Sequence, residues 1–163
     1  MVPTDTPGTL RIMPCPSAKA GIQTFADLKA MGVTDVLSML PVEEAADLGM
    51  SQEAEHCASN KIRFRSYPIK DFGLPDPSHF ADLIRDVKES LEAGHHLAVH
   101  CRAGIGRSGM VAACTLIALG ATAQTAVTLT ARARGVSIPD TVEQGNFIAS
   151  FAQAAKSVFQ SRN

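Results

Sequence analysis

Residues 100–109 read His-Cys-Arg-Ala-Gly-Ile-Gly-Arg-Ser-Gly, and this stretch decides how the surrounding chain folds. The apolar residues 97–99 before it predict a buried strand, and the apolar run 110–119 after it predicts a helix. A strand, a glycine-rich loop and a helix N-terminus in this order form an anion cradle. Backbone N–H groups point inward there, and the helix dipole adds about half a positive charge. The sequence therefore predicts an anion-binding loop between a strand and a helix.

Cys101 lies at the base of this predicted cradle. Positive surroundings lower the pKa of a cysteine thiol from about 8.5 to roughly 3.5–7.5. We therefore expect Cys101 to be a thiolate at neutral pH and to act as a nucleophile facing a bound oxyanion.

Arg107 indicates that the oxyanion is a phosphate. A guanidinium offers a planar fork of donors that matches two phosphate oxygens, and fixed donors stabilise the charge that shifts during phosphoryl transfer. Cys101 would attack phosphorus and form a phosphocysteine, which water later hydrolyses. We expect Ser108 to donate a hydrogen bond to the departing sulfur. His100 is expected to orient the loop and help polarise Cys101 rather than to act as a base.

Outside the loop, segments typical of strands alternate with segments typical of helices. Strands are expected at 10–13, 33–40, 62–67 and in the run leading into Cys101. Helices are expected at 24–31, loosely over 41–60, after an Asp76 cap with Pro77 at the first helical position, and at 110–119, 123–134 and 142–159. The alternation predicts an α/β fold with a mainly parallel sheet of four to five strands flanked by helices. In such sheets a site lies at the carboxyl ends of the strands, where Cys101 falls.

The motif His-Cys-x5-Arg-Ser at 100–108 resembles the signature of the cysteine-dependent protein tyrosine phosphatase superfamily, in its dual-specificity branch. Residues 68–76 resemble the general-acid loop of the kinase-associated phosphatase subfamily, the cyclin-dependent kinase inhibitor type. Arg134, Thr141 and Gln144 resemble its glutamine loop. The similarity runs from about residue 10 to 151. It implies a protein tyrosine phosphatase-like fold and hydrolysis of phosphotyrosine, phosphoserine or phosphothreonine in proteins.

The resemblance also assigns roles to individual residues. Asp71 is expected to protonate the leaving group and then to act as base toward the water that attacks phosphocysteine, a contribution of about 10²–10⁴ in rate. Asp76 is the rival acid, but its place before Pro77 explains it as a helix cap. The residues expected to bind phosphate are Arg102, Ala103, Gly104, Ile105, Gly106 and Arg107.

Two assignments stay open in the sequence. Thr141 and Gln144 have the spacing of a capping box, in which the glutamine side chain folds back onto the N-cap amide. The resemblance instead gives Gln144 the role of holding the hydrolytic water, and both roles can hold in part. Arg102 can either contact substrate or point into solvent.

Composition sets the wider expectations. The chain has 163 residues, a formal net charge of −1 and four cysteines without a Cys-x-x-Cys pair. These values suit a single domain over 1–163 in a reducing cytoplasm, without nucleic acid or membrane as a partner. We expect fraying at 1–8 and 161–163, a monomer, and a phosphorylated protein or peptide as the partner. No cofactor and no metal are expected, since His96 and His100 have no visible third ligand.

Other functions use loops of similar appearance. Gly104, Gly106 and Gly109 match the dinucleotide fingerprint, but no acidic residue follows before Gly135. Sulfur transfer or arsenate reduction would need neither Asp71 nor Gln144. A non-catalytic phosphate-binding module on the same fold is separated from an enzyme only by measuring turnover.

Two further features bear on substrate and regulation. A lysine inside the loop would suit phosphoinositides, whereas position 105 is isoleucine. Cys57 and Cys114 are expected to be small buried hydrophobic residues. A protective disulfide between Cys101 and another cysteine cannot be read from the sequence.

Overall fold

The computed structural model describes residues 1–17 and 21–159, so the fraying expected at 161–163 lies outside the described residues. The strands are β1 (Thr9–Met13), β2 (Asp35–Ser38), β3 (Arg63–Ser66) and β4 (His96–His100). The helices are α1 (Gly21–Ala30), α2 (Val42–Asp47), α3 (Glu53–Ser59), α4 (Pro77–Glu92), α5 (Arg107–Ala118), α6 (Ala123–Arg134) and α7 (Val142–Phe159).

The four strands form one parallel sheet in the order β1-β4-β2-β3, which confirms the expected α/β architecture. His100, the last residue of β4, lies level with Met13 of β1 and Ser38 of β2. Cys101 therefore follows at the carboxyl edge of the sheet, between two neighbouring strands. Ligands bind at this edge in open α/β sheets.

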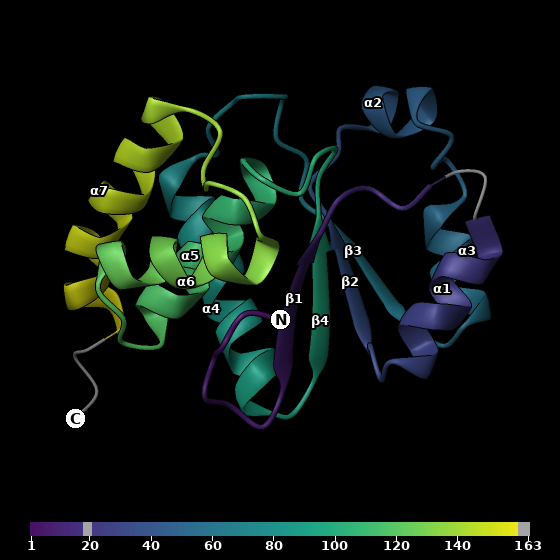
Figure 1. Ribbon diagram of the computed structural model, residues 1–163, viewed down its shortest axis with the longest axis horizontal. Helices are drawn as coiled ribbons and strands as arrows, with labels where there is room; N and C mark the ends of the chain where they lie inside the picture. The colour runs from purple at the N-terminus through teal and green to yellow at the C-terminus, as the bar shows by residue number, and fades with distance from the viewer. Residues whose placement is uncertain (18–20, 160–163) are drawn as a thin grey trace.

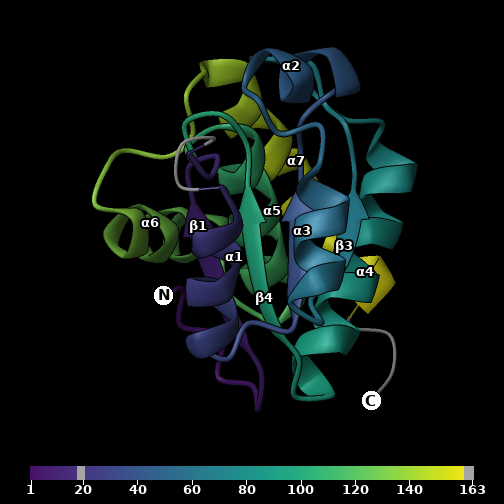
Figure 2. The same ribbon diagram turned by 90° about the vertical axis from the view of Figure 1, so that its right-hand side faces the viewer.

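Helices cover both faces of the sheet. Figure 1 shows α4, α5, α6 and α7 over one face, α1 and α3 over the other, and α2 beyond the carboxyl edge. Figure 2, which looks onto the α1 and α3 side, shows β1 and β4 side by side behind these helices. Successive β4 side chains enter opposite layers, since Leu97 and Val99 pack with α4 to α7 while Ala98 packs with α1 and α3.

The helix that follows Cys101 is buried along its whole length. Every residue of α5 is buried, because the sheet lies on one side of it and α4, α6 and α7 surround the rest. The helix begins at Arg107, three residues before the apolar run from which we predicted it. The last residues of the signature motif therefore form the first turn of a rigid core helix.

The start of α4 is as expected. Asp76 Oδ1 accepts hydrogen bonds from the backbone N–H groups of Ser78 and His79, each at 3.0 Å, and Pro77 occupies the first turn. The Ser78 hydroxyl also donates to Oδ1, at 2.6 Å; this bond is the main cause that holds the pKa of Asp76 below its usual value, and the bond from the His79 N–H is the next. Asp76 is thus a helix cap.

Two expectations are corrected. Residues 1–8 are held rather than frayed: Val2 is 1 % exposed and its N–H donates to the Leu10 carbonyl at 2.8 Å, because an apolar side chain at this position completes the core beside β1. The loose helical region predicted over 41–60 is two helices, α2 and α3. Gly49, with φ 71°, turns the chain between them.

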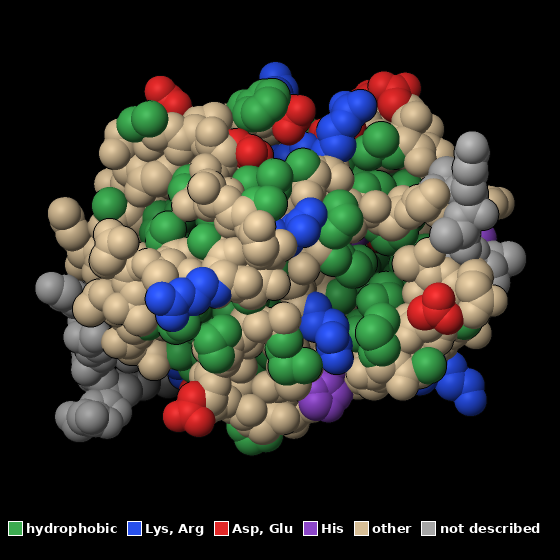
Figure 3. Space-filling view, in the orientation of Figure 1, with side chains coloured by type: hydrophobic (Ala, Val, Ile, Leu, Met, Phe, Trp, Pro, Cys, Tyr) green, Lys and Arg blue, Asp and Glu red, His purple; other side chains and the backbone are tan. Residues whose placement is uncertain are grey.

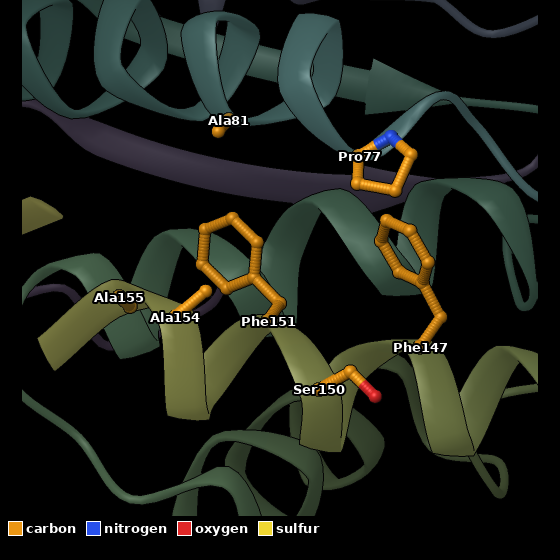
Figure 4. Close-up of a pocket in the computed structure, with 7 residues that line it drawn as sticks. All are labelled: Pro77, Ala81, Phe147, Ser150, Phe151, Ala154 and Ala155. Carbon is orange, nitrogen blue, oxygen red and sulfur yellow. The ribbon is translucent and has the colours of Figure 1, made fainter. Parts of the chain in front are cut away.

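The two long helices α4 and α7 meet through aromatic rings. Phe80 of α4 contacts Phe147 edge-to-face, with ring centroids 5.3 Å apart. Figure 4 shows Phe147 and Phe151 pointing from α7 toward α4 beside an apolar pocket. The residues that line this pocket are Pro77, Ala81, Phe147, Ser150, Phe151, Ala154 and Ala155.

Candidate active site

The loop between β4 and α5 is tied to the strand beside it. Gly104 has φ 70°, and a Cβ there would overlap the backbone carbonyl of Met13. The Cys15 N–H donates to the Arg102 carbonyl at 3.0 Å. Position 104 therefore needs glycine for two reasons, a left-handed φ and a close backbone approach.

Arg134, the last residue of α6, holds the loop from outside. Its Nε donates to the Gly104 carbonyl at 3.0 Å and its Nη2 donates to the Ala103 carbonyl at 2.9 Å. Because Arg134 turns the Ala103 and Gly104 carbonyls outward, the N–H groups of the same two peptide planes can face the inside of the loop. In the sequence, Arg134 stood out only through the resemblance. In the structure, it holds two carbonyls of the loop by hydrogen bonds.

Cys101 lies at the bottom of the loop and is 2 % exposed. Its Sγ is 3.2 Å from the Ser108 Oγ, and Ser108 is fully buried. The hydroxyl can therefore donate to a thiolate at this position. The predicted pairing of sulfur and hydroxyl is present in the geometry.

Arg107 reaches from the first turn of α5 across the site. Its Nη1 and Nη2 donate to the two Glu44 carboxylate oxygens at 2.7 and 2.9 Å. Nη1 also donates to the Ile69 carbonyl at 3.0 Å, and Nη2 donates to Asp71 Oδ1 at 2.9 Å. The guanidinium is thus fixed by α2 on one side and by the Asp71 segment on the other.

The Arg107–Glu44 pair shifts the pKa of both groups. The hydrogen bond from Arg107 holds the pKa of Glu44 below its usual value, against the opposing effect of burial. Burial works to lower the pKa of Arg107, but the Glu44 hydrogen bond and the charges of Cys101, Glu44 and Asp71 raise it above its usual value. Both groups are therefore charged at neutral pH.

Asp71 lies on the loop between β3 and α4, where the resemblance places a general acid. Its carboxylate contacts Arg107, and Oδ1 also accepts the Phe72 N–H at 3.2 Å. Phe72 has φ 56°, a region that non-glycine residues rarely adopt, and is 63 % exposed. The segment therefore brings one carboxylate and one exposed ring to the mouth of the site.

His100 does not reach the sulfur through a hydrogen bond among the described residues. Its Nε2 lies 2.7 Å from Glu53 Oε1, and both side chains are buried. Its Nδ1 lies 3.4 Å from the Cys101 carbonyl oxygen. This arrangement agrees with an orienting role for His100, with Glu53 of α3 as the group that holds the ring.

Gln144 forms only half of the capping box that the sequence allowed, and its side chain does not fold back onto the N-cap amide. Its N–H donates to the Thr141 Oγ1 at 3.1 Å, which is one half of a capping box. Its side-chain Nε2 donates instead to the Gly73 carbonyl at 3.4 Å. The side chain is fully buried and lines the same pocket as Cys101.

Six of the predicted site residues line one pocket of about 120 Å³, whereas His100, Gly104, Gly106 and Ser108 are not among its lining residues. Its lining residues are Asp71, Phe72, Cys101, Arg102, Ala103, Arg107, Asp140 and Gln144. Ile105 instead packs against the core. Basic and acidic side chains are mixed along the upper edge of the molecule in Figure 3, where the strands end.

Three residues of the site escaped the sequence analysis. Glu44 and Glu53 come from helices far from the motif in sequence, and Asp140 precedes α7. No spacing signal links them to Cys101, since only packing brings them to the carboxyl edge of the sheet.

The other cysteines are free thiols in the structure. Burial raises the pKa of Cys15 to about 11, with the nearby Glu53 charge adding to it, and raises the pKa of Cys57 to about 12. Burial also raises the pKa of Cys114 well above its usual value. Cys57 and Cys114 lie in the two apolar layers, as predicted.

Among the residues that the structure describes, no three or more histidine, cysteine and acidic side chains are grouped to hold a metal ion. No helix within the same residues combines the length and apolar character needed to cross a membrane.

Several known proteins are similar to this chain. Cyclin-dependent kinase inhibitor 3 of Sus scrofa is 27% identical over 138 residues, which are 83% of this chain and 65% of that protein. The chain thus spans slightly less than two thirds of this curated relative. Protein tyrosine phosphatase domain-containing protein 1 of Mus musculus is 35% identical over 97 residues, 60% of this chain and 12% of that protein.

Solved structures share the fold. Kinase associated phosphatase, with its catalytic-site cysteine substituted by serine, has a TM-score of 0.78 at 21% identity, covering 94% of this chain and 88% of that chain. Tk-PTP in its active form has a TM-score of 0.74 at 20% identity, covering 90% and 92% of the two chains.

A family model described as "Swiss Army Knife protein, DSP-PTPase phosphatase domain" matches residues 5–158. The match includes β1, the signature loop, the Asp71 segment and Gln144. By this match and by the geometry of its site, the chain belongs to the PTP-SAK family of DSP-PTPase phosphatase domains.

Proposed function

We propose that this protein is a phosphoprotein phosphatase that hydrolyses phosphate monoesters through a phosphocysteine on Cys101. One observation carries the proposal: a buried thiol beside a hydroxyl, a fixed guanidinium and a carboxyl line the same small pocket. These groups supply a nucleophile, a sulfur hydrogen-bond donor, a phosphate clamp and an acid.

In the first step the Cys101 thiolate attacks phosphorus. The phosphorus–sulfur bond forms as the bond to the ester oxygen breaks, and the Asp71 carboxyl gives its proton to that oxygen. A bound phosphate competes with Asp71 for the Arg107 guanidinium. Substrate binding would thus release Asp71 from Arg107 and ready it as an acid.

In the second step water attacks the phosphocysteine and gives a proton to a carboxylate at the pocket mouth, while the phosphorus–sulfur bond breaks and the thiolate returns. The Ser108 hydroxyl, 3.2 Å from the sulfur, stabilises the returning anion. The buried Gln144 side chain is proposed to hold this water, while Arg102 at the mouth contacts the substrate.

The exposed ring of Phe72 supports a preference for phosphotyrosine among the phosphoamino acids. It lies next to the proposed acid and lines the pocket mouth, where it can stack on the aromatic ring of a substrate. Phosphoserine and phosphothreonine offer no ring for this contact.

We also propose that residues 1–163 work as one monomeric domain in a reducing cytoplasm. Its substrate would be a phosphorylated protein or peptide, and it would need no metal or cofactor. A Cys101 thiolate needs reducing conditions to stay active.

The test is a phosphopeptide panel assayed under reducing conditions. We expect turnover that a chelator does not reduce and that vanadate inhibits competitively. Absence of turnover on every peptide and on p-nitrophenyl phosphate would contradict the proposal.

A further inference from the structure

Two oxygen acceptors lie together over Gly106 at one side of the phosphate loop. A Cβ placed on Gly106 would be 2.6 Å from Asp140 Oδ2 and 2.6 Å from Gln144 Oε1. The two oxygens can therefore be no further apart than the sum of these distances. A molecule the size of water would contact both at once.

The Gln144 oxygen lacks a partner. Gln144 is 0 % exposed, and among the described residues its Oε1 is a buried oxygen without a hydrogen-bond partner. Its Nε2 donates to the Gly73 carbonyl at 3.4 Å, so Oε1 is the side-chain atom left without a partner, in a residue that lines the pocket. A buried acceptor without a donor is costly, so a donor such as water is expected beside it.

Asp140 differs from Asp71 in what it contacts. Asp71 accepts a hydrogen bond from Arg107 at 2.9 Å, whereas Asp140 forms no hydrogen bond or ion pair with the residues that the structure describes. Asp140 is exposed at the pocket mouth and directly precedes the Thr141 cap of α7. Its carboxylate is thus available to a ligand in the pocket.

We propose that Asp140 is a second catalytic carboxylate, the base for hydrolysis of the phosphocysteine, with Gln144 Oε1 as its partner in holding the attacking water. This assignment rests on the proposed function and divides the acid and base tasks between Asp71 and Asp140. The water donates one hydrogen to Gln144 and gives its other proton to Asp140. Its oxygen forms the new bond to phosphorus, and the phosphorus–sulfur bond breaks to return the thiolate.

Asp140→Asn tests this step, because it keeps the shape of the side chain and removes the base. In rapid-quench experiments with p-nitrophenyl phosphate, the variant is expected to release one burst of p-nitrophenol and then accumulate phosphoenzyme. Decay of that phosphoenzyme is expected to slow by about 10². Formation of the phosphoenzyme should keep its rate.

Inhibition by inorganic phosphate gives a second readout. Removing a carboxylate from the pocket mouth removes repulsion, so Asp140→Asn should bind phosphate at least as tightly as the wild type. Glu143→Gln is the matched control, since this neighbouring carboxylate is exposed, loses the same charge and does not line the pocket. It should leave both steps unchanged.

The outcomes separate this inference from the proposed function. Wild-type turnover together with an unchanged decay rate in Asp140→Asn, or a loss confined to phosphoenzyme formation, would overturn the role of Asp140 alone. Failure of the wild type to form any phosphoenzyme would instead overturn the function. An Asp71→Asn variant whose phosphoenzyme decays slowly, beside an unaffected Asp140→Asn, would return the base task to Asp71.

Discussion

The floor and the mouth of the phosphate pocket are built differently. The floor consists of Cys101, Arg107 and Ser108, all buried at the junction of β4 and α5. The mouth carries Asp71, whose side chain is 43 % exposed, and Phe72, which is 63 % exposed. A buried floor fixes charges before substrate arrives, whereas an exposed mouth leaves the acid and the ring able to adjust to it.

From this contrast we infer that the floor and the mouth recognise different parts of a substrate, the phosphate and the leaving group. Under the proposed function, the floor would recognise a phosphate whatever its ester group, since its donors would meet only the anion. The mouth would contact the leaving group. Substitutions in the floor should therefore affect all substrates equally, and those at the mouth should discriminate between substrates.

The largest effect is expected at the floor. Cys101→Ser should abolish turnover of p-nitrophenyl phosphate and phosphopeptides alike, because a hydroxyl in this position is a far weaker nucleophile than a thiolate. Far-UV circular dichroism should show an unchanged fold. Cys15→Ser, which alters a thiol near the loop whose pKa is about 11, is the control and should stay active. Hydrolysis by Cys101→Ser at the wild-type rate would remove the proposed nucleophile.

At the mouth, Asp71→Asn should lower kcat by about 10²–10⁴ on alkyl or phenyl phosphates, which have poor leaving groups. The loss should be much smaller on p-nitrophenyl phosphate, whose leaving group needs little protonation. Steady-state kinetics on a series of aryl phosphates measures this dependence.

Asp76→Asn is the matched control for that series. Asparagine caps helices as well as aspartate does, so the fold and the rates should be retained. Equal losses on good and poor leaving groups in Asp71→Asn would exclude the acid role.

Phe72→Ala should reduce kcat/KM on phosphotyrosine peptides by up to about tenfold, as an aromatic pair contributes about 0.5–1.5 kcal/mol. Matched phosphothreonine peptides should be hydrolysed at the wild-type rate. Leu74→Ala, an exposed apolar change on the same loop, is the control. If both peptide classes lose activity together, Phe72 acts on the loop rather than on the substrate.

The smallest effect is expected at Glu44, which holds the Arg107 guanidinium of the floor. The pKa of Glu44 is lowered in the folded protein by Arg107, so this pair stabilises the fold above the unfolded pKa of about 4.3. That stabilisation is lost as the pH falls through the lower, folded pKa. Thermal unfolding of Glu44→Gln and wild type should therefore differ at pH 7 and converge in acid. A constant difference at every pH would show that the ion pair is not its source.

The strand and the loop around Cys101 and the start of α4 were predictable, because a few neighbouring residues specify each of them. The apolar run before Cys101, the glycines after it and the Asp76–Pro77 cap specify a strand, a loop and a helix start within a few residues. Asp71 was found only through resemblance, since an aspartate between proline and glycine is equally typical of a turn.

The sequence by itself placed Cys101 and Arg107 in one loop and predicted the parallel sheet that presents them, because periodicity and short-range geometry encode these features. Only the tertiary structure decided that Glu44 holds Arg107, that Glu53 holds His100, and that Asp140 lies beside the Gln144 oxygen. These contacts join segments far apart in the chain, and they arise from packing around the carboxyl edge of the sheet. No local pattern reports such packing, since it depends on how all the layers fit together.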